Sequence, residues 1–207
     1  PHWHSLPLAV LAILQRRDRW YRWQRAAAHH RQHRQSLCAS CITTFAVSSI
    51  INRRLSTVDV QNATLAGGVA IGASSNLKIS PASALIIGTS AALVSTLGFN
   101  KLQPILEDKF NLHDSCGVHN LHGLPAILGS IAVTIAVAIP SNKGSVIYPK
   151  GDQQYLAQIG GASITLLVAH LSGLFVGAVL KRVPSGAGPA TPPFRDHPFW
   201  TEATKED

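Results

Sequence analysis

The sequence lacks methionine altogether and has little charge: Asp, Glu, Lys and Arg make up 14% of its 207 residues, and hydrophobic residues make up 46%. Soluble domains carry roughly a quarter of charged residues, so this balance favours a membrane protein. The absence of methionine predicts that the chain is a fragment or a processed piece of a longer product. Its length suffices for one domain with a sizeable core.

Cysteine is also scarce: three cysteines occur, an odd number that does not form a disulfide framework. Cys38 and Cys41 form a C-x-x-C pair. Redox or zinc chemistry is one interpretation of that pair, but its apolar surroundings favour two small residues that pack between helices. The sequence has no paired carboxylates, no nucleophile beside a base and no phosphate-binding loop, so we expect neither an enzyme nor a cofactor.

The positive charge is unevenly distributed. A net charge of +8 would suggest nucleic acid or an anionic surface as a partner if the basic residues were spread along the chain. Seven of the 18 Lys and Arg residues and three of the four Trp residues instead precede residue 35. The apolar run from Leu6 to Leu14 in this segment is too short to span a bilayer. We therefore predict that residues 1–35 are a divergent basic and aromatic segment outside the fold, and we expect no nucleic-acid partner.

From residue 36 the pattern changes to long apolar stretches with brief polar breaks. About 20 apolar residues are needed to cross a bilayer as a helix. Stretches that meet or approach this length are predicted at Ser36–Asn52, Gln61–Asn76, Ala82–Leu102, Gly117–Ile139 and Leu156–Leu180. Their many Gly, Ala and Ser residues favour close packing of helix backbones. The pattern thus predicts an all-α integral membrane protein of about five transmembrane helices over residues 36–182; a soluble helical bundle is the alternative.

The chain after Val183 is rich in Pro and Gly and ends in charged residues. This composition predicts a flexible tail over residues 183–207. If the tail is cytoplasmic, the loops on that side carry more Lys and Arg than the opposite loops, as the positive-inside rule requires.

Two histidines stand three residues apart in the stretch from Cys116 to Pro125, CGVHNLHGLP, at the start of an apolar run. His119 and His122 share a helix face at this spacing. Three interpretations remain open on the residues alone: a metal site, a hydrogen-bonded pair within a bundle, and a working group in a conduction path. With Cys116 one helix supplies at most two ligands, so a zinc site would need others that the sequence does not provide.

From about Ser36 to Lys181 the chain resembles the C-terminal half of an Rh glycoprotein, in the Amt/Mep/Rh family of ammonium transporters. The resemblance is carried by VDVQNATLAGGVAIGASSNLKISPASALIIGTSAALVSTLGF at 58–99, LHDSCGVHNLHGLPAILGSI at 112–131 and FRDHPFW at 194–200. It implies a partial copy of an eleven- or twelve-helix fold built from two inverted repeats. It also implies a multi-pass plasma-membrane protein that assembles as a homotrimer, or as a hetero-oligomer with other Rh proteins.

The resemblance assigns roles to individual residues. His122 matches the second of two pore-lining histidines, and Val118 matches an apolar pore-lining position. Asp114 matches an acidic residue that supports the helix start, whereas His119 falls at a variable position and receives no pore role. Asn62, within an N-x-T sequon, is expected to cap a helix or to form a hydrogen bond between helices.

The function that the resemblance implies is transport of ammonium as neutral NH3, with CO2 as a further candidate. An ammonium ion pays a large desolvation cost in an apolar channel, and NH3 does not. An imidazole can accept and donate hydrogen bonds along such a path. Because the first repeat is missing, this chain is expected to be an incomplete fragment. The alternative is a non-conducting, Rh-like membrane or scaffold protein.

Overall fold

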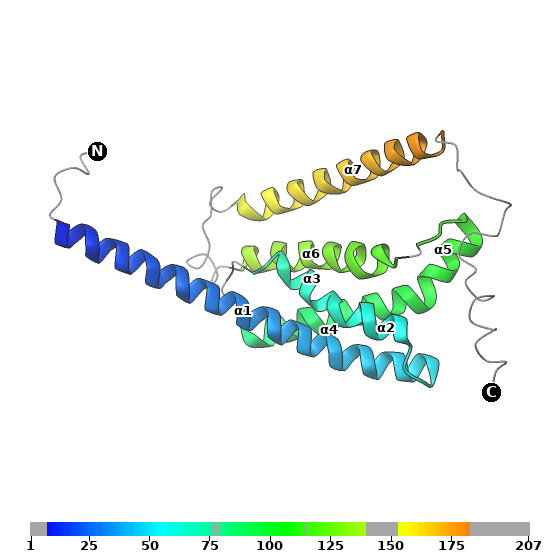
Figure 1. Cartoon of the computed structure of the whole chain (residues 1–207), viewed down its shortest axis with the longest axis horizontal. Helices are drawn as coiled ribbons and strands as arrows, with labels where there is room; N and C mark the ends of the chain where they lie inside the picture. Colours follow the sequence, from blue (N-terminus) through cyan, green and yellow to red (C-terminus); the bar gives the residue numbers. More distant parts are fainter. Residues whose placement is uncertain (1–7, 76, 78, 115, 140–152, 183–207) are drawn as a thin grey trace, which may run out of the picture. The chain divides into compact units, whose positions relative to one another are not determined.

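The structure, a computed structural model, describes residues 8–75, 77, 79–114, 116–139 and 153–182, with side chains from His29 onward. It is all-helical, which confirms the predicted fold class. The predicted tail at 183–207 lies outside the described residues. In chain order the helices are α1 (Leu8–Asn52), α2 (Thr57–Asn62), α3 (Ala66–Gly72), α4 (Pro81–Leu97), α5 (Gln103–Phe110), α6 (Leu124–Ala138) and α7 (Gln154–Leu180) (Figure 1).

Short helical turns connect several of these helices. A 3-10 turn at Ala63–Leu65 joins α2 to α3. A π-helical turn at Gly98–Leu102 joins α4 to α5, and a second one at His119–Gly123 leads into α6. π-Helical turns are rare in proteins and are frequent at functional sites.

In the described part of the chain, three helical segments are long and apolar enough to cross a membrane: Pro81–Phe110, His119–Ala138 and Gln154–Leu180. They coincide with the last three predicted spans. The predicted span at 36–52 is the C-terminal part of α1, and the one at 61–76 is divided among the end of α2, the 3-10 turn and α3.

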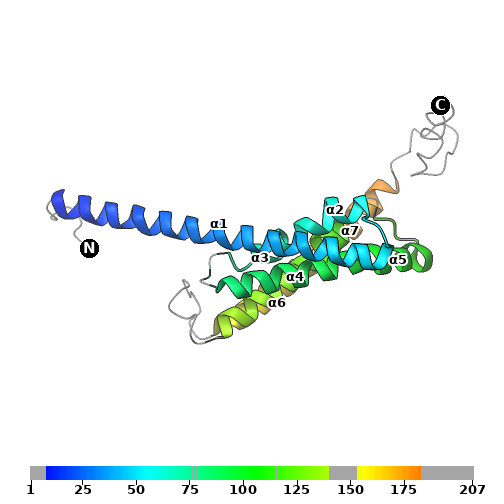
Figure 2. The ribbon, with the colours of Figure 1, turned by 90° about the horizontal axis from the view of Figure 1, so that it is seen from below.

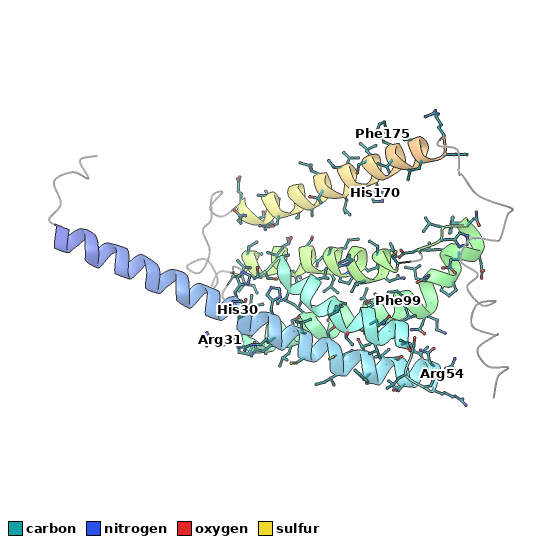
Figure 3. All side chains as sticks on the ribbon, in the orientation of Figure 1. His30, Arg31, Arg54, Phe99, His170 and Phe175 are labelled. Carbon is teal, nitrogen blue, oxygen red and sulfur yellow. The ribbon has the colours of Figure 1, made fainter. Side chains whose placement is uncertain are left out.

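The chain forms two compact units, residues 1–162 and 163–207. The second unit contains most of α7, the helix that carries His170 and Phe175 in Figure 3. His170 Nδ1 lies 2.7 Å from the carbonyl oxygen of Leu166 in the same helix.

In the first unit, α3 and α4 pack between α1 and α6, and Figure 2 shows α4 between those two helices. Small residues make this packing close. The glycine at 88 in α4 lies directly against the backbone carbonyl of Ser36 in α1, and Gly129 of α6 lies directly against that of Ala70 in α3. A side chain on either glycine would collide with the backbone of the neighbouring helix, so both contacts depend on glycine.

One face of α1 carries a polar residue at every fourth position, and all of these side chains are buried: Gln32, Ser36, Ser40, Thr44 and Ser48. Ser36 Oγ donates to Gly67 O at 2.7 Å, and Ser40 Oγ donates to Ala63 O at 2.9 Å. Since hydroxyls on a helix face are costly to bury without partners, these bonds fix α1 against the 3-10 turn and α3. We call this row of five side chains the α1 polar row.

The helix α1 continues unbroken across residue 35, where we predicted that the fold begins. Gln32 is buried, and its Nε2 donates to Leu77 O at 2.8 Å. The packing between α1 and the rest of the unit therefore includes at least this residue of the 1–35 segment. The boundary at residue 35 stays a prediction.

Candidate functional site

The start of α6 is organised by one carboxylate. Asp114 Oδ1 accepts a hydrogen bond from the Val118 amide at 3.0 Å, and Oδ2 accepts one from the His119 amide at 2.8 Å. These are amides that a helix start leaves without partners, and an acidic side chain is the favoured acceptor there. Gly117, with φ of +67°, makes the reversal between Asp114 and these amides. Asp114 thus caps the turn that leads into α6, and the supporting role that the resemblance assigns to it stays a prediction.

Both histidines of the motif lie in the π-helical turn at His119–Gly123, and their environments differ. His119 is half-buried, and its Nδ1 lies 3.2 Å from Oδ1 of Asn120. His122 is exposed on the first unit, as is Val118, whose exposed fraction is 53%. The motif therefore contains one histidine tied to a neighbouring amide and one histidine that faces outward from the unit.

Asn120 is the most buried side chain of this turn, with 1% exposed. Its Nδ2 donates to Gln103 Oε1 at 3.0 Å, and Gln103 Nε2 donates in turn to Glu107 Oε1 at 3.0 Å. Asn120 also lies beside Gly98, where an added Cβ would be 2.6 Å from its Oδ1. The two π-helical turns are thus locked together by a satisfied polar network, which holds the backbone that carries His122.

Aromatic packing closes the same junction. An added Cβ on Gly117 would lie 2.5 Å from Cε1 of Phe99, so this ring packs directly on the glycine backbone. Phe99 is labelled in Figure 3. The positive φ and the ring each disfavour a side chain at position 117.

A buried carboxylate is bonded to the first π-helical turn. Asp59 in α2 is 1% exposed, and its two oxygens each accept from Asn100 Nδ2 at 3.0 Å. Asn52 Nδ2 at the end of α1 also donates to Asp59 Oδ2, at 3.2 Å. We call Asp59, Asn52 and Asn100 the Asp59 cluster. It joins α1, α2 and the turn after α4 through one desolvated charge.

The sequence interpretation missed the Asp59 cluster and the Asn120–Gln103 pair. A charged residue at position 59, next to an apolar stretch, was the signal that could have identified the cluster, because an ionisable residue in such a place is costly unless it is partnered. Asn62, which was selected instead, donates from Nδ2 to Val58 O of its own helix at 2.9 Å. It stands at the N-cap position of the 3-10 turn at Ala63–Leu65, and its side chain makes no capping hydrogen bond there.

The described part of the chain contains no group of three or more His, Cys, Asp and Glu side chains placed to hold a metal ion. All three cysteines are exposed. Cys116 precedes the turn that carries His119 and His122.

Comparison with known proteins gives consistent matches. The model of the Ammonium Transporter Family matches residues 23–185. The ammonium transporter Rh type C of Oryctolagus cuniculus is 39% identical over 183 residues, which cover 83% of this chain and 36% of that protein. The Rh type B transporter of Takifugu rubripes is 40% identical over 179 residues, covering 80% of this chain and 39% of that protein. The chain therefore spans about two fifths of the length of these relatives.

A solved structure gives the corresponding likeness in three dimensions. Nitrosomonas europaea Rh50, of the Rhesus protein family of channels, superposes with a TM-score of 0.66 at 31% sequence identity. The superposition covers 88% of this chain and 48% of that one. The matched range of the family model begins at residue 23, inside the segment that we predicted to lie outside the fold.

Proposed function

Because the chain belongs to the ammonium transporter family, a family of channels and not of enzymes, we propose that it is part of an Rh-type channel that conducts NH3 after NH4+ has lost its proton. CO2 is a further candidate for passage. The chain corresponds in this proposal to the C-terminal half of the channel, with residues 36–182 in the membrane and residues 183–207 as a cytoplasmic tail. The plasma membrane is the proposed location, and a homotrimer or a hetero-oligomer with other Rh proteins is the proposed assembly.

One observation carries the proposal: an outward-facing histidine on a rigidly held turn. His122 is exposed, and the turn that bears it is fixed by Asp114 at its start and by Asn120 at its centre. A pore-lining group must project from the bundle while its backbone stays in place, and this turn meets both needs. His122 and Val118 are the proposed pore-lining residues, with Asp114 and Asn62 in supporting roles.

The chemistry follows from the difference between an ion and a neutral molecule. NH4+ and K+ both lose hydration in an apolar passage, but only NH4+ can shed its charge by giving up a proton. The imidazole of His122 offers a donor at one nitrogen and an acceptor at the other, so it can replace part of the water that NH3 leaves. This role requires no metal and no covalent step.

The test compares two histidines of one turn. The longest protein that the gene encodes and this chain alone are each reconstituted into proteoliposomes. NH3 entry is measured in a stopped-flow instrument as the rise of the internal pH. We expect His122→Ala to change the flux by about two- to tenfold, the worth of one hydrogen bond. His119→Ala, the matched control, should leave the flux unchanged. A non-conducting membrane or scaffold protein would be supported instead if all variants gave equal NH3 fluxes, or if the unsubstituted protein gave no more flux than vesicles without protein.

A further inference from the structure

Two histidines outside the proposed pore residues stand together on α1. His29 and His33 are four residues apart, which places them on the same helix face. Their ring centroids are 5.5 Å apart, and the ring planes differ by 5°. Both side chains are half-buried. They precede the apolar part of α1, and neither lies in the three segments that are long and apolar enough to span a membrane.

We propose that His29 and His33 form a two-histidine binding site for a divalent late transition-metal ion, with water completing the coordination. Imidazole is a good ligand for Zn²⁺, Cu²⁺ and Ni²⁺. Two histidines at positions i and i+4 of a helix are the arrangement by which a single helix gives two ligands to one ion. Among these ions Cu²⁺ is expected to bind best, in keeping with the general order of divalent affinities.

The ring geometry is close to what such an ion needs. A ligating nitrogen stands about 2.0–2.1 Å from Zn²⁺, so two rings on one ion must lie within a few ångströms of each other. His29 and His33 already do so at 5.5 Å between centroids. The torsion that turns each ring has broad minima, so a rotation from the stacked to a converging arrangement costs little.

The backbone under the site is held in place. Gln32, between the two histidines, donates from Nε2 to Leu77 O at 2.8 Å and is buried. This contact fixes α1 where it begins to run beside α4; Figure 3 labels His30 and Arg31 at this point. His30, one residue beyond His29, points about 100° away from His29 around the helix, because a helix turns once in 3.6 residues. It stands three residues before His33, so the His30→Gln variant tests whether His29 and His33, and not His30 and His33, are the pair that binds the ion.

The experiment measures metal binding by the full chain in detergent micelles. Cu²⁺ and Zn²⁺ are titrated against a chelating dye, with His29→Gln, His33→Gln and His30→Gln in parallel. We expect each of the first two variants to lose at least about tenfold in affinity, the lower end of the cost of disturbing a metal site. His30→Gln should bind as the unsubstituted chain does.

A second measurement guards against misfolding and against background from the other histidines of the chain. Circular dichroism and thermal melting without metal establish that the variants are folded. Zn²⁺ should raise the melting temperature of the unsubstituted chain and of His30→Gln, but not that of the other two variants. The proposal is overturned if His29→Gln and His33→Gln bind as tightly as the unsubstituted chain, or if His30→Gln weakens binding as much as they do. None of these outcomes bears on ammonia conduction.

Discussion

Asn100 donates through a single Nδ2 to both oxygens of Asp59, at 3.0 Å each, and so ties the turn after α4 to a helix that precedes it by 41 positions in the chain. The carboxylate is 1% exposed, so its charge is stabilised by amide donors and not by water. A buried carboxylate of this kind stabilises the fold only while its donors are present.

Asn100→Leu should therefore destabilise the protein by about 1–3 kcal/mol, because it leaves a desolvated carboxylate with fewer donors. The control is Gln61→Leu, since Gln61 is an exposed residue of the same short helix as Asp59. Its cost should be within about 0.5 kcal/mol, as for other residues away from such features. Reversible unfolding in mixed detergent micelles measures both.

A double variant sharpens this prediction. Adding Asp59→Leu to Asn100→Leu removes the charge together with its donor, so part of the lost stability should return. Costs that simply add would show that the two residues act independently, contrary to the geometry.

Gly88→Ala should destabilise the bundle by about 1–3 kcal/mol, because a methyl group at this position would meet the carbonyl group of Ser36 and force α4 away from α1. Gly160→Ala in α7 is the comparison, since no atom lies within 4 Å of the added Cβ. That change should be neutral or stabilising by up to about 1 kcal/mol through helix propensity. We expect Gly88→Ala to lower the melting temperature and Gly160→Ala to leave it unchanged or to raise it. A Gly88→Ala protein as stable as the original would contradict the described packing.

Asp114→Ala should loosen the start of the π-helical turn that leads into α6. The expected loss of stability is about 0.5–2 kcal/mol, the usual value of a lost cap. Hydrogen exchange of the Val118 and His119 amides measures the local effect directly, because these two amides lose their acceptor. Asp108→Ala, at an exposed position of α5, is the control and should leave both rates unchanged. Slow exchange in the Asp114→Ala protein would show that another group caps this turn.

The sequence predicted the helices well where hydrophobicity decides their position. The spans at 82–102, 117–139 and 156–180 appear because long apolar runs have few alternatives to a helix. His122 lies in the π-helical turn before α6, and Asp114 accepts hydrogen bonds from two amides at the start of that turn. Their pore and supporting roles remain proposals.

The sequence could not reveal the π-helical turns or the partners of the buried polar groups. A π-helical turn adds one residue to a helix without changing its composition, so no local pattern marks Gly98–Leu102. Asp59 and Asn100 become partners only once the chain brings α2 to the turn after α4, and single-sequence reasoning has no access to that approach. The boundary at residue 35 stays a prediction. It rests on an abrupt change in composition, whereas helix formation depends on backbone bonds, and α1 runs from Leu8 to Asn52.

The α1 polar row has a consequence for how the helix finds its alignment. Its serine and threonine positions repeat every four residues, so α1 displaced by one turn would present hydroxyls to nearly the same carbonyl groups. The middle of the row therefore does little to favour one alignment of α1 over another shifted by one turn. The positions at either end are specific: Gln32 begins the row and donates to Leu77 O, and Asn52, four residues beyond the row, donates to Asp59 Oδ2. These two different contacts hold a helix with a repetitive middle in one alignment.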